Sequence, residues 1–344
     1  SMISSVQLQR GLGTSANGAG AFGASINMST AAVSSDPFGS AELSLGSYGT
    51  FVGTFAAGSG LTKSGLYFNA AYSKGLTDGY IRNAFADVQS AMAVVGWMNE
   101  KNSLRLTWLM GDQRTGITWE GISPEQYAVD RRYNPAGEYY DDAGNVHYYD
   151  NETDNYRQHH IQASWNHSFG NFITWNTALN FTKGDGYYEN YKADAKFSKY
   201  GLDMQHGRSS SDFIVQKAMD NSFYAANSGL ILQKGIVKAS ASVSYGYYDG
   251  NHFGDVIWSK HLELNDSFRW YRNNGIKQDY SGYVRAEVDF ANNFTGFADL
   301  QYRGVSYKLD GPDKDFAVLN WEKKYNFFNP KAGFTYAPGD NSRI

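Results

Sequence analysis

Residues 173–181, ITWNTALNF, decide the fold class because apolar and polar side chains alternate along them. The odd-numbered positions from Ile173 to Phe181 carry mostly apolar or aromatic side chains, and the even-numbered positions carry Thr, Asn, Ala and Asn. A period of two is the period of a β-strand, in which successive side chains point to opposite faces. The stretch is therefore predicted to be a strand with one apolar and one polar face.

The same alternation recurs along the whole chain, for example over 66–73, 102–110, 237–245 and 284–290. The 26 Tyr, 21 Phe and 8 Trp favour pleated strands, and the 37 Gly serve turns. The longest nearly pure apolar run, 91–98 (AMAVVGWM), is far shorter than the roughly 20 residues that a membrane-spanning helix needs. The sequence predicts an all-β protein with about twelve strands, at 41–47, 50–57, 64–74, 90–98, 102–111, 158–169, 172–183, 213–233, 236–248, 280–291, 294–309 and 326–337.

The predicted connections between these strands alternate in length. Short ones are expected near 99–101, 170–171, 234–235, 291–293 and 338–342, and long ones at 75–90, 112–157, 184–212, 249–279 and 310–325. Outer-membrane barrels have short periplasmic turns and long external loops, whereas loops beyond about 15 residues are uncommon in compact soluble domains. The pattern therefore favours an antiparallel transmembrane β-barrel over a soluble sandwich.

Composition excludes several classes of function. Lys plus Arg is 30 and Asp plus Glu is 34, giving a net charge of −4 without any basic stripe, so nucleic acid is not expected as a partner. The chain has no cysteine, which excludes disulfides and thiolate chemistry. No Ser/His/Asp spacing indicates an enzyme, and no cofactor is predicted.

Candidate metal ligands are few. His159 and His160 are adjacent, so on a strand they face opposite sides and cannot share one ion. The acidic stretch 141–154 (DDAGNVHYYDNETD) departs from the EF-hand spacing, so a solvated loop is expected and weak divalent-ion binding stays open. A haem role for a loop histidine also stays open, because neutral imidazole is a natural iron ligand. The loop histidines are His147, His206 and His252.

Residues 6–30, VQLQRGLGTSANGAGAFGASINMST, are similar to the closing segment of the plug in TonB-dependent receptors. The glycine-rich part lacks the Lys-Ser/Thr of a P-loop, so a structural turn is expected there. The stretch 41–55 (AELSLGSYGTFVGTF) resembles the first barrel hairpin of that family, with a tight outer turn at 46–49. Loop blocks 133–135 (YNP) and 148–156 (YYDNETDNY) resemble receptors of the Bacteroides group. The plug pattern falls on Arg10, Gly11, Gly18, Gly20, Gly23, Ile26 and Asn27.

The resemblance implies a 22-stranded barrel in the bacterial outer membrane, in contact with lipid and closed by an N-terminal plug. Residues 1–35 would be the end of the plug and 36–344 the first part of the barrel; the segment that TonB grips would lie upstream. Residues 20–30 look more like the branch that imports ferric siderophores, haem or cobalamin than the sugar branch. The expected cargo is thus an iron complex. The alternative is a surface β protein that binds carbohydrate, either a sugar importer or an adhesin.

Aromatic and arginine side chains in the predicted external loops are the expected ligand contacts. Aromatic faces bind planar or apolar groups, and Arg binds anions bidentately. The alternative is that these residues only pack the loops on themselves or form interfacial girdles. They are Trp119, Arg131, Arg132, Tyr133, Tyr139, Tyr140, Tyr148, Tyr149, Tyr187 and Tyr188.

Overall fold

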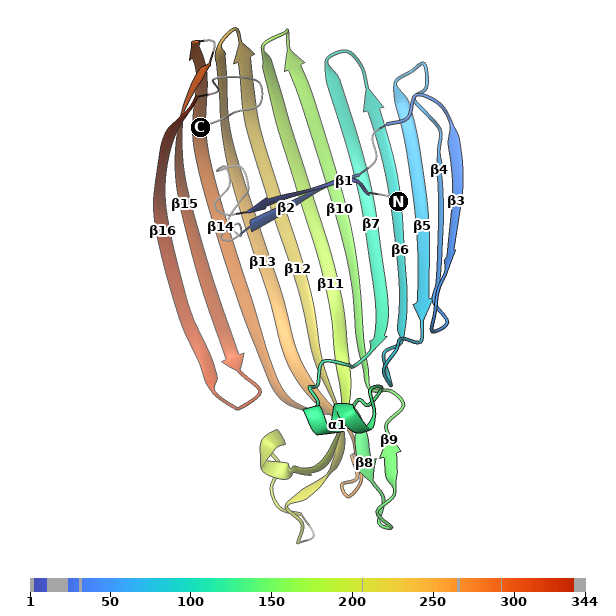
Figure 1. Ribbon diagram of the computed structural model, residues 1–344. Coiled ribbons are helices and arrows are strands. Elements are labelled where there is room, and N and C mark those ends of the chain that lie inside the picture. The colour runs from blue at the N-terminus through green and yellow to red at the C-terminus, as the bar shows by residue number, and fades with distance from the viewer. Residues whose placement is uncertain are drawn as a thin grey trace.

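The chain forms one twelve-stranded antiparallel sheet in which every strand pairs with its neighbours along the chain (Figure 1). The computed structural model describes residues 3–10, 24–30, 33–205, 207–264, 267–291 and 293–336. All twelve predicted strands are present. They are β3 (Phe38–Leu45), β4 (Phe51–Gly58), β5 (Leu66–Thr77), β6 (Ala86–Met98), β7 (Asn102–Gly116), β10 (Thr153–Phe169), β11 (Ile173–Lys196), β12 (Ser210–Lys234), β13 (Val237–Ser259), β14 (Phe268–Ala291), β15 (Phe294–Pro312) and β16 (Val318–Tyr336).

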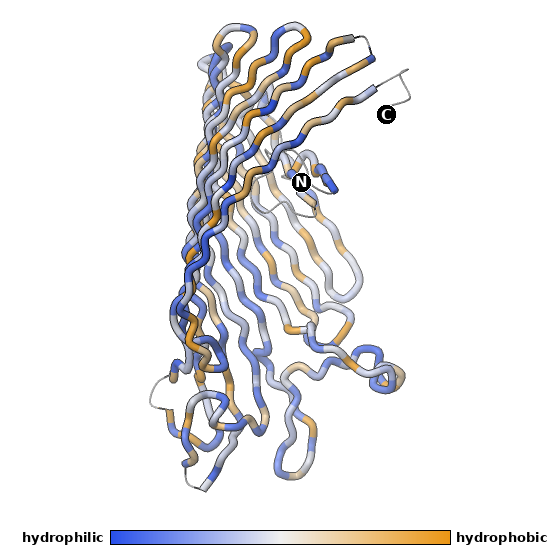
Figure 2. The backbone as a smooth tube through the Cα atoms, turned by 90° about the vertical axis from the view of Figure 1, so that its left-hand side faces the viewer, coloured by the Kyte–Doolittle hydropathy of each residue, from blue (hydrophilic) through white to orange (hydrophobic). Residues whose placement is uncertain are grey.

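The sheet curves, and a separate hairpin lies within its concave side (Figures 1 and 2). This hairpin pairs β1 (Ile3–Arg10) with β2 (Ala24–Thr30), and Asn27 lies opposite Gln7. Its last residue accepts a hydrogen bond from the wall, because Arg105 Nη2 donates to Thr30 Oγ1 at 2.6 Å. The predicted plug-motif glycines Gly11, Gly18, Gly20 and Gly23 lie outside the described residues.

The contact between Arg105 and Thr30 identifies the concave face, and the strand register carries that assignment across the sheet. The opposite, convex face is apolar and open: Leu230, Val284 and Leu300 are 49%, 59% and 51% exposed. Figure 2 shows hydrophobic residues alternating with polar ones toward the short-turn edge. We call the convex surface of these strands, which includes Leu106 and Leu179, the apolar band. An apolar exterior around a polar interior is the arrangement of a transmembrane barrel wall.

The long-loop edge differs from the sequence prediction. Most of the expected long loops are wrong in length, since the strands continue through them and leave connections of only 78–85, 197–209, 260–267 and 313–317. The tyrosine-, asparagine- and glycine-rich ends keep pairing in register because backbone hydrogen bonds do not depend on an apolar face. The short connections are as predicted, and the turn expected at 338–342 lies outside the described residues.

One true long loop, 117–152, joins β7 to β10. It contains helix α1 (Pro124–Val129), which Ser123 caps, and a small hairpin of β8 (Glu138–Tyr140) with β9 (Val146–Tyr148). No helix among the described residues is long and apolar enough to cross a membrane. The turn at 46–49 lies at this same edge, as predicted, since Asp78 N donates to Tyr48 O at 2.8 Å.

The outer ends of the strands carry a core of the kind found in soluble proteins. The short helix η2 (Phe197–Tyr200) packs on β12, β13 and β14, and Phe197, Tyr200 and Phe213 are at most 1% exposed. We call this cluster the outer core; its other buried members are Val215, Val256, Leu262 and Trp270.

Candidate functional site

A hollow lies on the concave face beyond the apolar band, toward the long-loop edge. It consists of two cavities of about 570 and 350 Å³ that share His252, Tyr271 and Lys314. Register places its side chains on one face, because Lys217 pairs with Tyr188 and Lys277 pairs with Tyr307 across neighbouring strands. We call this hollow the tyrosine–lysine basin. Its defining residues are Tyr188, Lys217, His252, Tyr271, Lys277, Tyr307 and Lys314.

Glycines opposite the aromatic side chains shape the basin. A Cβ atom at Gly254 would lie 2.4 Å from Tyr271 Cε1, so the tyrosine ring lies across a position that only glycine can fill. At Gly186, a Cβ atom would lie 2.3 Å from Asn155 O. Missing side chains at these positions let the rings lie close to the sheet. The wall is therefore lined by broad aromatic faces.

Three lysines line the basin on its concave face: Lys277 pairs with Asp279 at 3.8 Å, Lys314 pairs with Asp315 at 2.5 Å, and Lys217 is the third. Lys217 Nζ lies 5.7 Å from the centroid of the Tyr188 ring, and no ion pair joins Lys217 to a carboxylate among the described residues. Burial, followed by repulsion from Lys314, lowers the pKa of Lys217. Burial and the nearby lysines likewise lower the pKa of Lys199. Lys217 lies outside the apolar band, which begins on β12 at Tyr224, and toward the long-loop edge of the sheet.

Two acidic residues line the basin as well. Asp313 is held in its own turn, where its carboxylate accepts the N–H groups of Asp315 and Ala317 at 2.9 Å. Asp154 lies at the other end, and burial raises the pKa of its carboxyl group. Burial also raises the pKa of Tyr271 to about 12, so its phenol is neutral at ordinary pH.

Two of the sequence-predicted ligand contacts meet at the basin. Trp119 comes from the long loop and Tyr188 from β11, and their rings pack edge to face with centroids 5.6 Å apart. Tyr187 also contributes to the lining of the smaller cavity, although its side chain points to the other face of β11. The sequence prediction did not include Lys217, Tyr271, Tyr307 or Lys314. The sequence placed each of these residues in a strand or a loop. It did not show which residue would lie beside each of them across the sheet.

The other predicted contacts have partners within the loop or its surroundings. Glu138 accepts hydrogen bonds from the hydroxyls of Tyr133, Tyr140 and Tyr148 at 2.8, 2.9 and 3.2 Å. The Arg82 guanidinium lies 3.5 Å from the Tyr148 ring centroid. The structure thus ties these tyrosines into one cluster around a carboxylate.

Of the remaining four residues, Tyr139, Tyr149 and Arg132 fasten the loop to neighbouring elements, and Arg131 packs within the loop. Tyr139 stacks on Tyr191 of β11 at 4.5 Å, and the Tyr149 hydroxyl donates to Glu189 Oε1 at 2.5 Å. The Arg132 side chain donates to Tyr80 O at 2.9 Å, and the guanidinium of Arg131 lies over the ring of Tyr127 at 5.3 Å.

Histidines and acidic residues form no metal centre among the described residues. His160 hydrogen-bonds Thr182 on the concave side, whereas His159 stacks near Trp108 on the convex side, so the two rings are separated as expected. His147 is held by Asp141 at 3.0 Å, His252 lines the basin, and His206 lies outside the described residues.

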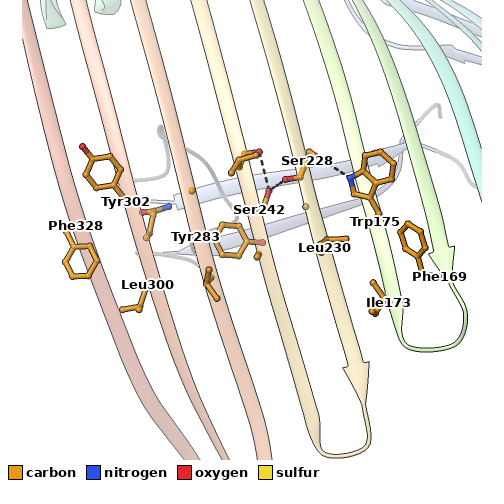
Figure 3. A pocket seen from close by; sticks show the side chains of 16 residues that line it. Phe169, Ile173, Trp175, Ser228, Leu230, Ser242, Tyr283, Leu300, Tyr302 and Phe328 are labelled. Atoms are coloured by element: carbon orange, nitrogen blue, oxygen red, sulfur yellow. Dashed lines mark hydrogen bonds between the residues drawn. The ribbon is translucent and has the colours of Figure 1, made fainter.

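A larger hollow of about 940 Å³ lies on the convex face, within the apolar band (Figure 3). Leu230, Leu300 and Phe328 line it, and Trp175 Nε1 donates to Ser228 Oγ at 2.8 Å. A polar group inside a bilayer needs a hydrogen-bond partner within the protein, and the N–H group of Trp175 has such a partner in Ser228. Apolar side chains thus make up most of the lining of this hollow.

No protein-family model and no curated protein sequence matches this chain. Solved structures do match. The ferric-catecholate import receptor Fiu from E. coli K12, in its open form, gives a TM-score of 0.73 at 15% identity, covering 98% of this chain and 58% of that chain. The siderophore receptor PiuA from Acinetobacter baumannii gives 0.69 at 14%, covering 98% and 52%. The copper transporter OprC gives 0.72 at 13%, covering 97% and 48%.

The chain thus spans about half the length of these structures. The identities lie in a range where likeness establishes the fold alone. Together with the curved meander, the apolar convex face and the hairpin on the concave side, the comparison leads to one conclusion: the chain has the barrel-wall fold of TonB-dependent receptors.

Proposed function

We propose that this chain belongs to a TonB-dependent importer of the bacterial outer membrane and that its cargo is an iron complex, such as a ferric siderophore. The observation that carries the proposal is the β1–β2 hairpin within the concave side of a wall whose convex side is apolar. The apolar band would face lipid. Residues 1–35 would be the end of a plug, and 36–344 the wall around it.

The link between hairpin and wall suits a plug that moves. Besides the hydrogen bond from Arg105 to Thr30, Val33 packs against the small cluster of Tyr67, Met92 and Val94. Such contacts hold a rest position but are weak enough to break when TonB pulls from the periplasm. The tyrosine–lysine basin lies at the opposite, long-loop end, where cargo would arrive.

The names of the matching structures support import as the activity and metal complexes as cargo. They include a ferric-catecholate import receptor, a siderophore receptor and a copper transporter. The Bacteroides-type, siderophore-like branch rests on the sequence resemblance at 20–30, 133–135 and 148–156. Haem and cobalamin are the other members of that cargo group. Transport, rather than catalysis, is the proposed role.

The test is tryptophan-fluorescence quenching of the complete protein in detergent, titrated with ferric siderophores, haem, cobalamin and oligosaccharides. Trp119 at the basin provides a local reporter. We expect saturable binding of an iron complex, and TonB-dependent uptake of radiolabelled iron by cells. Binding of oligosaccharides alone would replace this proposal with the carbohydrate alternative.

A further inference from the structure

We propose that the convex face carries a seat for one anionic phospholipid, whose acyl chains lie in two apolar hollows and whose phosphate lies between Lys101 and Lys234 at the short-turn edge. The inference goes beyond import, because it concerns the outer surface of the wall and holds whatever the cargo is. It requires only that the apolar band meets lipid.

The first observation is a pair of hollows with a ridge of aromatic rings between them. Besides the hollow of about 940 Å³, which extends from β10 to β16, a second hollow of about 440 Å³ extends from β5 to β11. Trp165 lines the second hollow and Trp175 lines the larger one. Their rings lie edge to face with centroids 4.8 Å apart, so the two tryptophans stand between two apolar grooves.

Hydrogen bonds and ring contacts hold this ridge in place. Trp165 Nε1 and His167 Nδ1 both donate to Asn102 Oδ1, at 3.1 and 2.8 Å. The His167 ring also packs edge to face on Phe169, with centroids 4.4 Å apart. Figure 3 shows Phe169 and Ile173 beside the short turn that joins β10 to β11, so the ridge extends to the short-turn edge. A ridge that is already ordered loses little side-chain freedom when a ligand binds beside it.

A glycine forms the floor of the larger hollow. Ser228, Val243 and Gly282 lie in one row across β12, β13 and β14, and the row continues through Tyr302 and Phe328. A Cβ atom at Gly282 would have its nearest neighbour 3.7 Å away, at Val243 Cγ1, so this position is open on the convex face. The row therefore has a depression at Gly282, between larger side chains on both sides.

A lysine lies at the short-turn end of each hollow. Lys101 immediately precedes β7, which lines the second hollow, and Lys234 ends β12, which lines the larger one. The carbonyl oxygen of Lys101 accepts a hydrogen bond from Ser168 N at 2.8 Å, and Lys234 Nζ lies 5.3 Å from the centroid of the Phe172 ring. Ser168 and Phe172 flank the turn after β10, so the two lysines lie on either side of the ridge.

The charge at this edge is positive. The charged residues of the three segments 99–101, 170–172 and 234–236 are Lys101, Lys234 and Glu100. Neither lysine has an ion-pair partner among the described residues. Lysines at the membrane surface attract anionic lipids, and an ammonium group binds phosphate oxygens. A zwitterionic lipid already carries an ammonium group beside its phosphate, so the two lysines favour the anionic lipid.

The experiment measures which lipid reaches the ridge of the complete protein in phosphatidylcholine vesicles. Phosphatidylglycerol or phosphatidylcholine with a spin label on one acyl chain is added, and quenching of tryptophan fluorescence gives the relative affinity. The part of the quenching that is lost in Trp175→Phe reports on the ridge.

Two variants test the two parts of the seat. Lys101→Gln/Lys234→Gln removes both charges, and Gly282→Leu fills the depression in the larger hollow. Lys308→Gln is the matched control, because Lys308 is an exposed lysine on the same face of β15 as Leu300 but lies near the long-loop edge. Circular dichroism checks that each variant is folded.

We expect phosphatidylglycerol to bind at the ridge at least about fivefold more tightly than phosphatidylcholine, and the double lysine variant to bring the two within about twofold. Added salt should weaken the preference, and Lys308→Gln should leave it unchanged. Gly282→Leu should reduce the quenching of Trp175 by both lipids.

Equal affinity of the two lipids, or an unchanged preference in the folded double variant, would overturn the charge selection. Quenching of Trp175 that Gly282→Leu leaves intact would overturn the seat in the larger hollow. Weak quenching by every lipid, together with a dimer in cross-linking, would assign the hollows to a second copy of the chain and overturn the proposal.

Discussion

The apolar band and the outer core belong to the same strands but place their hydrophobic side chains in opposite environments. In the band, Val284 is 59% exposed on the convex face, whereas Phe213 in the outer core is fully buried between η2 and the sheet. Exposed apolar side chains are what a barrel wall presents to acyl chains, whereas a buried apolar cluster is what a protein forms in water. Apolar side chains are therefore exposed at one end of a strand and buried at the other end of the same strand.

The largest effect is expected from emptying the outer core. Phe213→Ala removes a ring that lies 4.9 Å from Tyr200 and 5.9 Å from Phe197, and should destabilise the outer end by about 3–5 kcal/mol. Hydrogen exchange of the amides in 197–215 would measure it. Phe328→Ala is the matched change in the apolar band, where Phe328 is 65% exposed. Because lipid would fill the space left by the ring, the loss in free energy of unfolding should be clearly smaller there. Equal costs at both sites would remove the distinction between the two regions.

A charge on the convex face tests the lipid contact directly. Val284→Arg should cost about 2–4 kcal/mol in a bilayer, because a midplane arginine must leave water. Asn227→Arg is the control, since Asn227 is exposed on the concave face of β12. Urea unfolding from phospholipid vesicles would compare them. If Val284→Arg were as well tolerated as Asn227→Arg, the convex face would not be facing lipid.

The long-loop end should respond to pH through Lys217. Burial, followed by repulsion from Lys314, lowers the pKa of Lys217, so its ammonium charge is lost at a lower pH than that of a free lysine. Tyr271, with a pKa of about 12, and Lys314, whose pKa is raised by Asp315, change charge later. If cargo docks at the basin, the affinity of the complete protein for an anionic ferric siderophore should fall by about tenfold over this pH range. Lys217→Gln should show no such step, and an identical step in that variant would assign it to another group.

The smallest effect is expected at Glu152, a 1% exposed side chain that fastens the long loop. It accepts Tyr191 N at 2.8 Å, and burial raises the pKa of its carboxyl group. A raised pKa of an acid means that the folded loop is most stable at low pH and loses stability as pH rises from the ordinary glutamate value to the raised one.

Glu152→Gln keeps an acceptor for the Tyr191 amide and has no charge to bury. It should change loop stability by about 1 kcal/mol or less and abolish the pH dependence of the protection factor of the Tyr191 amide, which is its exchange rate relative to that of an unfolded chain at the same pH. Asp142→Asn in the same loop, at a fully exposed side chain, is the control. A pH dependence that survives in Glu152→Gln would point to a different carboxylate.

Much of the wall was predictable from alternation, and much of the candidate site was not. The pattern at 173–181 predicted a strand and its apolar side, because a period of two is a local property. The basin depends instead on register: Lys217 meets Tyr188 only because β12 pairs with β11 over more than twenty residues, beyond the point where the sequence predicted a loop. In that region both faces are polar or aromatic, so alternation disappears although pairing continues.

What the sequence by itself determined is the number of strands in the large sheet, the side of each that is apolar and the edge at which the turn at 46–49 lies. Only the tertiary structure decided that the outer strands extend into the predicted loops, that Trp119 reaches Tyr188, and that the lysines of the basin gather on one wall. The physical reason is the distance along the chain over which each feature is determined. Side-chain alternation is fixed between nearest neighbours, whereas a binding surface is made by residues that strand pairing and loop packing bring together from distant parts of the chain.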